Sequence, residues 1–347
     1  MRNLNTCIGV THSIRRSNLY NDVLKLFDKP EVLSHYPLRI SFVSEMAVDV
    51  GGVCRDMLSG FWEEAYRQLF DGSTLMTPVV HAQSNMSTFA TLGRILSHGY
   101  MVEGFLPVRI AFPTLAAMLL GQGVTVSDEV LIHSFADSLH SVEASLIKGS
   151  LAVASKSFTT GVQSKLISLF SRFGSRQLPT PHNLRQQIVQ VAHYEFLIKP
   201  MAALSMIHLG IPVNEQPFWK RKSVDDLHSL YTCLTATPSK VLEIMEEPEF
   251  VNPAQERVYG YLVQFIGNMK PGEVRNFLRF VTGSSVLSYA PIKVTFNDLS
   301  GLARRPIAHT CDNCLELPTN YSTYIDFTSE FEAILSDTEY SWSMDAI

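Results

Sequence analysis

Apolar residues recur at helical spacing along most of this chain, and only short stretches alternate in the manner of a β-strand. Helical stripes occupy residues 57–69, 87–98, 127–140, 183–208 and 322–334, whereas strand-like alternation is seen at 38–43 and 292–296. A parallel α/β sheet would need strands and helices in regular alternation. The pattern therefore predicts an α+β fold. Pro200 is expected to break or kink the helix over 183–208.

The segment EEPEFVNPAQE, residues 246–256, is the best candidate for a boundary within the chain. Two prolines and several acidic residues interrupt the helical pattern there. A new helix should start directly afterwards, because Asn252 suits the N-cap, Pro253 the first helical position and Gln255 the third. We expect this segment to be a flexible hinge between two parts of the chain.

Composition limits the classes of partner. The chain has 28 Lys and Arg against 33 Asp and Glu, and after Arg305 it has only acidic charges. Nucleic acid is therefore not an expected partner, because phosphates need compensating cations. No apolar run approaches the ~20 residues of a membrane span, so no membrane partner is expected either. Five mostly isolated cysteines fit a reducing compartment. We expect an intracellular protein, cytoplasmic or nuclear.

The stretch RRPIAHTCDNCLELP, residues 304–318, holds two of the five cysteines beside a histidine. A structural zinc site would need a second pair of ligands, and a thioredoxin-like pair would need to open a helix. If residues 307–311 are extended, His309 and Cys311 project to the same face, which would suit a nucleophilic thiolate. A buried, inert thiol is the simplest alternative. The residues alone leave these alternatives open.

A second stretch, VDVGGVCRD at 48–56, places two glycines ahead of a helix. It lacks the Gly-Lys-Ser/Thr ending of a P-loop and the Gly-x-Gly-x-x-Gly pattern of a dinucleotide site. A tight turn from strand to helix that needs glycine torsions is the favoured interpretation.

Taken in order, these segments resemble the HECT-type ubiquitin ligase domain. The stretch 306–318 matches the family pattern Pro-x-Ala-His-Thr-Cys-x-Asn-x-Leu-x-Leu-Pro, and FLRFVTGSSVL (277–287) resembles Leu-x-Phe-Val-Thr-Gly-Ser-Ser. FVSEMAVDVGGVCRD (42–56) is similar to Phe-x-Gly-Glu-x-Gly-x-Asp-x-Gly-Gly-x-x-Arg-Glu. The chain departs from that last pattern at Ser44, Ala47 and Asp56, and it has Trp342 where the family commonly has a Phe near its C-terminus.

The resemblance implies a bilobal fold. Residues 1–250 would be a larger, mostly helical N-lobe that binds a ubiquitin-conjugating enzyme, and residues 254–347 a smaller α/β C-lobe. By order along the chain, the docking surface would fall at 178–210. The implied partners are ubiquitin, a conjugating enzyme and a protein substrate, with no cofactor and no metal.

The resemblance also implies site residues. Cys311 would form a thioester with ubiquitin and pass it to a substrate lysine. His309 and Thr310 would orient and polarise the site, Asn313 would make backbone or oxyanion contacts, and Asp312 or Glu316 could accept the proton of the lysine. The alternative is a catalytically weak or inactive HECT-like module that binds ubiquitin or a conjugating enzyme. A third hypothesis is a zinc or redox protein that uses Cys311 and Cys314.

Overall fold

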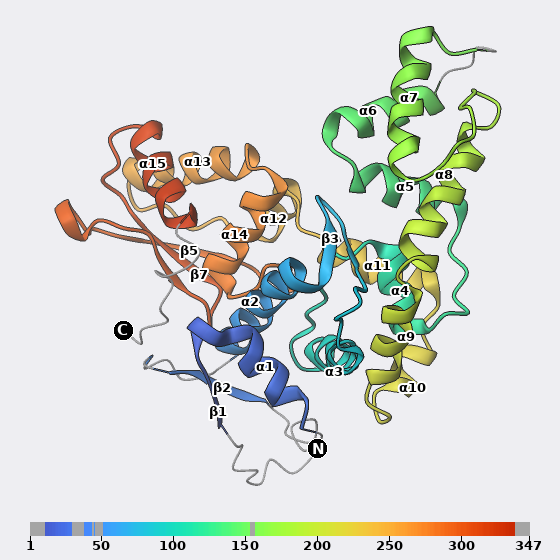
Figure 1. Cartoon of the computed structure of the whole chain (residues 1–347). Helices are drawn as coiled ribbons and strands as arrows, with labels where there is room; N and C mark the ends of the chain where they lie inside the picture. The colour runs from blue at the N-terminus through green and yellow to red at the C-terminus, as the bar shows by residue number, and fades with distance from the viewer. Residues whose placement is uncertain (1–10, 30–37, 44, 46–50, 153–156, 337–347) are drawn as a thin grey trace. The chain divides into compact units, whose positions relative to one another are not determined.

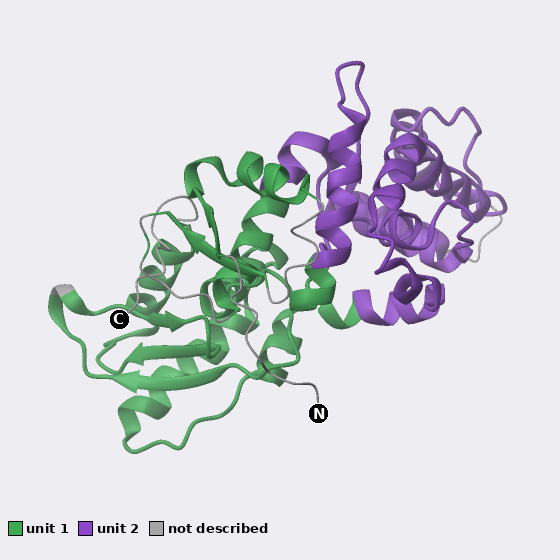
Figure 2. Ribbon diagram, turned by 90° about the horizontal axis from the view of Figure 1, so that it is seen from below, with its two compact units in different colours: residues 1–63, 99–106, 232–347 green, residues 64–98, 107–231 purple. Residues whose placement is uncertain are grey.

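The computed structural model describes residues 11–29, 38–43, 45, 51–152 and 157–336. In this part of the chain, many helices are combined with three small sheets, so the fold is α+β as predicted (Figure 1). The chain forms two compact units. Unit 1 consists of residues 1–63, 99–106 and 232–347, and unit 2 consists of residues 64–98 and 107–231 (Figure 2). The expected division into lobes at residues 250 and 254 stays a prediction.

Unit 1 contains a three-stranded sheet and the helices that pack on it. The strand order is β5-β7-β6, with β5 (Lys293–Asn297) parallel and β6 (Ile307–His309) antiparallel to β7 (Cys314–Pro318). Leu315 and Leu317 of β7 alternate into the core, as expected for a half-buried strand. This core also includes side chains from four helices: α12 (Pro238–Ile244), α13 (Pro253–Gly267), α14 (Pro271–Thr282) and α15 (Tyr324–Ser336).

The start of α13 follows its sequence signals. The Asn252 side chain accepts hydrogen bonds from the backbone N–H groups of Ala254 and Gln255, and Pro253 occupies the first helical position. The Gln255 side chain in turn accepts from the backbone N–H of Val251. The predicted N-terminus is confirmed, because Asn and Gln here satisfy amides that the helix itself cannot.

The remainder of unit 1 comes mostly from the N-terminal part of the chain. β1 (Thr11–Ile14) pairs in parallel with β2 (Arg39–Phe42), next to α1 (Leu19–Phe27) and the first residues of α2 (Gly52–Leu69). The predicted strand at 38–43 is confirmed, because Leu38, Ile40 and Phe42 are buried while Arg39 is exposed.

Unit 2 is mostly helical. Its strands are the short hairpin of β3 (Phe70–Gly72) and β4 (Met76–Pro78). Its helices are α3 (Met86–Glu103), α4 (Phe112–Leu120), α5 (Asp128–Ser138), α6 (Ser141–Leu151), α7 (Thr160–Arg172), α8 (Leu184–His193), α9 (Met201–Gly210), α10 (Gln216–Lys220) and α11 (Val224–Leu234), with the boundaries between the units falling inside α2, α3 and α11.

The helix predicted over 183–208 is interrupted as expected. α8 ends at His193, a π-helical turn covers Tyr194–Ile198, and α9 starts after Pro200. Proline has no N–H to donate and its ring clashes with the preceding turn, which explains the interruption at this point. Within the described ranges, no helix is both long and apolar enough to cross a membrane.

Candidate active site

Cys311 lies in the turn of a β-hairpin in unit 1. The strands β6 and β7 pair with His309 opposite Cys314, and residues 310–313 form the turn between them. The backbone N–H of Asp312 donates to the His309 carbonyl at 3.1 Å. Asn313 closes the turn with φ = 50°, a left-handed conformation that asparagine tolerates better than most residues. The Cys311 side chain is exposed, so a buried, inert thiol does not describe it.

The structure corrects one expectation about this segment. The strand ends at His309, so residues 307–311 are not continuously extended and alternation does not place Cys311 beside His309. Asn313 adopts the left-handed conformation directly before β7 begins at Cys314. Thr310 and Cys311 are therefore part of the turn and not of either strand. His309 and Cys314 are cross-strand partners, so their side chains lie on the same face of the sheet.

The open face of this sheet holds a pair formed by a histidine and a carboxylate. His309 Nε2 lies 3.2 Å from Glu316 Oε2. Glu316 follows Cys314 by two residues in β7, so its side chain lies on the same face of the sheet as those of Cys314 and His309. Both side chains are partly exposed. Glu316 was one of two candidate proton acceptors from sequence, and the structure makes it the partner of His309. The other candidate, Asp312, is exposed in the turn.

Thr310 and Asn313 are held by the beginning of α2. Arg55 Nη2 donates to the Thr310 carbonyl at 2.8 Å and approaches Asn313 Oδ1 at 3.5 Å. Asn313 is buried, and its own carbonyl accepts from the backbone N–H of Lys293 at 2.9 Å. The turn that carries Cys311 is thus fixed on both sides of the cysteine.

The two glycines before α2 are required for different reasons. Gly51 has φ = 105°, which only glycine adopts readily, so the expected glycine torsion is confirmed there. Gly52 is needed for space, because a Cβ at that position would lie 2.6 Å from Thr310 Oγ1 and 3.2 Å from the Thr310 carbonyl carbon. The start of α2 therefore packs directly against the turn.

The segment that ends α14 meets α2 at the same place. Arg55 Nε donates to the Thr282 carbonyl at 3.0 Å. The Ser59 hydroxyl donates to the Gly283 carbonyl at 3.1 Å and accepts from the Ser285 N–H at 2.9 Å. The three sequence motifs, although distant in the chain, therefore form one hydrogen-bonded cluster in unit 1.

A charged network lies beside this cluster. Asp56 is buried and accepts from Arg16 Nη1 at 2.7 Å and from Arg279 Nε at 2.8 Å. Arg16 also pairs with Glu45 and stacks over the Phe42 ring. A buried carboxylate needs such partners, because removing it from water is otherwise costly. The network accounts for an acidic residue at position 56. The other departures noted from the sequence, Ser44, Ala47 and Trp342, lie outside the described residues.

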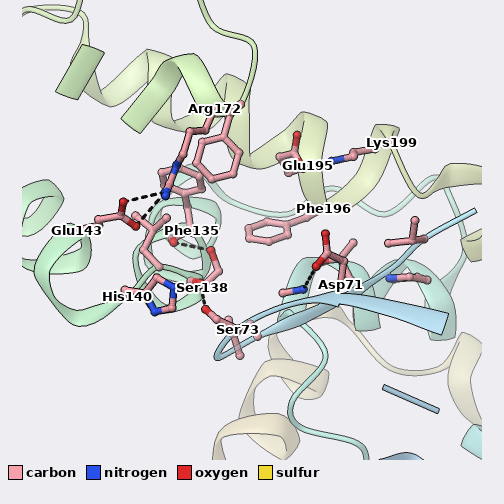
Figure 3. A pocket seen from close by; sticks show the side chains of 17 residues that line it. Asp71, Ser73, Phe135, Ser138, His140, Glu143, Arg172, Glu195, Phe196 and Lys199 are labelled. Carbon is pink, nitrogen blue, oxygen red and sulfur yellow. Dashed lines mark hydrogen bonds and ion pairs between the residues drawn. The ribbon is translucent and has the colours of Figure 1, made fainter. Parts of the chain in front are cut away.

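Unit 2 contains a separate pocket of about 380 Å³ (Figure 3). Phe135 and Phe196 supply part of its apolar lining. Its acidic and basic residues include two matched pairs, Glu143 with Arg172 at 2.9 Å and Glu195 with Lys199 at 2.7 Å. Cys311, His309, Thr310 and Asn313 do not line this pocket. Among the described residues there is no group of three or more His, Cys, Asp or Glu side chains that could hold a metal ion.

Thr310, Cys311 and Asn313 lie in the turn at 310–313, and His309 is the last residue of β6 directly before it. Sequence reasoning missed the role of Arg55 and of the space provided by Gly52. Arg55 and Gly52 both lie in the segment 42–56, which resembles a family pattern, and this resemblance was the one sign in the sequence that they matter. Their contact with Thr310 could not be read from it, because 255 positions separate Arg55 from Thr310.

A comparison with known protein families identifies the family to which this chain belongs. The family model described as HECT-domain (ubiquitin-transferase) matches residues 54–341, which include Arg55, the segment after α14 and the hairpin with Cys311. A search of curated proteins found no match to this chain. Because the family model covers most of the sequence, the chain belongs to the HECT-domain family of ubiquitin transferases.

Proposed function

We propose that this chain is an E3 ubiquitin-protein transferase in which Cys311 carries ubiquitin as a thioester. The observation that supports this most directly is an exposed cysteine in a turn whose neighbours on both sides are anchored, Thr310 by Arg55 and Asn313 by burial. A nucleophile must be accessible and also held in position, because correct placement supplies much of the rate of an acyl transfer.

The first step is an exchange between thioesters. The Cys311 thiolate attacks the carbonyl carbon at the ubiquitin C-terminus, which arrives as a thioester on a conjugating enzyme. A new S–C bond forms, the old one breaks, and the thiolate of the conjugating enzyme leaves. The two leaving groups are alike, so the exchange is nearly balanced in free energy and depends on positioning and on the thiolate form.

In the second step, a substrate lysine attacks the new thioester, forms an amide and releases the Cys311 thiolate. An amine with an ordinary pKa of about 10.4 must lose a proton to do this. We assign His309, oriented by Glu316, to orienting and polarising the site around the Cys311 sulfur in both steps. Thr310 and Asn313 are assigned to holding the turn, because their polar groups are engaged with α2 and β5.

The docking surface for the conjugating enzyme is proposed within residues 178–210. Tyr194, Ile198 and Met201 leave 51%, 43% and 46% of their surface exposed, which is unusual for large apolar residues. They follow one another closely along the π-helical turn and the first residue of α9, and all three side chains reach the surface. A group of exposed apolar side chains of this kind is typical of a surface that binds a protein.

Thioester formation by Cys311 is tested by incubating the chain with ubiquitin, activating enzyme, ATP and a panel of conjugating enzymes. Non-reducing gels should show a reductant-sensitive adduct for the wild type and none for Cys311→Ala. Cys233→Ala is the matched control, because Cys233 is also exposed. If the folded wild type forms no adduct with any conjugating enzyme, the proposal fails and a binding module becomes the better description.

The docking surface is tested with Ile198→Ser. This change should weaken binding of the conjugating enzyme that supports thioester formation, because it removes apolar area at the proposed contact. Val142→Ser is the control, since Val142 is exposed on α6 and is 79% accessible. Equal binding by both variants, measured by titration calorimetry, would place the surface elsewhere.

A further inference from the structure

Cys314 is a second thiol in the same hairpin, and the proposed reaction does not use it. It is the first residue of β7 and is partly exposed. Its Sγ lies 3.5 Å from the Thr295 hydroxyl on the neighbouring strand β5. Thr295 is exposed, so the sulfur of Cys314 is on the open face of the sheet and not in the core.

The turn brings Cys311 and Cys314 close in space. They are three positions apart, and Asn313 between them reverses the chain in the left-handed conformation. The backbone N–H of Asp312 donates to the His309 carbonyl, so Cys311 lies within a tight turn, and Cys314 pairs with His309 directly after that turn. Disulfides form across Cα separations of about 4.4–6.8 Å. Both cysteines lie at the turn end of the same hairpin, and a disulfide requires their Cα atoms to come within this range.

We propose that Cys314 is a resolving thiol that forms a reversible disulfide with Cys311 when the chain meets a peroxide. This inference rests on the proposed function only in its consequence, because a disulfide at Cys311 would remove the nucleophile that accepts ubiquitin. Reduction by a dithiol would return the free thiolate. The hairpin would then act as a switch that protects the catalytic sulfur from irreversible oxidation.

The chemistry balances with hydrogen peroxide as the oxidant. The Cys311 thiolate attacks one peroxide oxygen, which gives a sulfenic acid and hydroxide. The Cys314 thiolate then attacks the Cys311 sulfur and displaces hydroxide, so an S–S bond replaces the S–O bond. Overall, two thiols are oxidised and one peroxide is reduced to two waters. Without Cys314, the sulfenic acid would persist and could be oxidised further to forms that a dithiol does not restore.

The sequence makes the disulfide directly measurable by mass. Trypsin cleaves after Arg304 but not at the Arg305–Pro306 bond, and no Lys or Arg follows Arg305. Both cysteines, and no other, therefore fall in the peptide 305–347. After peroxide treatment and alkylation of free thiols, the wild-type peptide should carry no alkyl group and be about 2 Da lighter than the reduced peptide. A dithiol should reverse this.

The deciding comparison is between wild type and Cys314→Ser. After peroxide, dithiol treatment and removal of the dithiol, the wild type should recover ubiquitin loading, and Cys314→Ser should recover at least tenfold less. Cys314→Ala is the second variant, and loading before oxidation shows that each variant is folded. If the peptide does not lose about 2 Da, or if Cys314→Ser recovers fully, the inference is wrong. A mass loss in a chain that never loads ubiquitin would leave the disulfide established and refute the proposed function alone.

Discussion

Replacing Gly52 with alanine tests the contact between α2 and the turn that carries Cys311. Alanine normally stabilises a helix relative to glycine by about 0.5–1 kcal/mol, because glycine loses more backbone freedom on folding. At Gly52, the added Cβ would lie 2.6 Å from Thr310 Oγ1. Rotation of the Thr310 side chain could relieve this contact, but the Thr310 carbonyl carbon would remain 3.2 Å away.

Helix propensity and steric crowding act in opposite directions on the free energy of unfolding of Gly52→Ala. Crowding an extra methyl group into a packed contact costs about 1–3 kcal/mol. This cost exceeds the gain from helix propensity, so we expect Gly52→Ala to lower the free energy of unfolding by up to about 2 kcal/mol. Displacing Thr310 also moves the neighbouring Cys311, and a small misplacement of a reacting group can slow a reaction by about tenfold or more.

The matched control is Gly260→Ala. Gly260 is exposed within α13, and a Cβ there would have nothing within 4 Å. This variant should raise the free energy of unfolding by about 0.5–1 kcal/mol and leave ubiquitin loading unchanged. Urea denaturation gives the stabilities, and single-turnover gels give the rate of thioester formation. If Gly52→Ala stabilises the chain as much as Gly260→Ala and loads ubiquitin normally, the contact between α2 and the turn is refuted.

Three further predictions concern groups around the same hairpin. Arg55→Lys should lower the free energy of unfolding by about 1–3 kcal/mol in urea denaturation, because one ammonium cannot replace the guanidinium at its separate acceptors; an unchanged midpoint would contradict this. His309→Ala should slow thioester formation in single-turnover gels, and a wild-type rate would remove that residue from the site. Arg304 donates two hydrogen bonds to Asp326 and lowers the pKa of that carboxyl group. The ionised Asp326 therefore stabilises the fold above its ordinary pKa of about 3.9, and this contribution is lost as the pH falls through the lowered value. Asp326→Asn should accordingly reduce the melting temperature at pH 7 and flatten its decline below about pH 4; parallel curves for the two proteins would disprove the assignment.

Several features of this chain could be predicted from short stretches of sequence. The cap of α13 was predicted from Asn252 and Gln255, the interruption before α9 from Pro200, and the half-buried strand β2 from the alternation of Leu38, Ile40 and Phe42. Such features depend on groups only a few residues apart, so the local sequence is enough to specify them. The four expected site residues likewise lie close together in the sequence, within positions 309–313.

Other features required the tertiary structure. The helical periodicity was enough to predict a mostly helical chain with a few short strands, and the motif at 306–318 was enough to single out Cys311 with His309, Thr310 and Asn313. The sequence did not show that His309 pairs with Glu316, because this depends on the register of β6 against β7. It also did not show that Arg55 and Gly52 hold the turn. Contacts between such distant positions depend on how whole helices and sheets pack, and no periodicity within one segment records that packing.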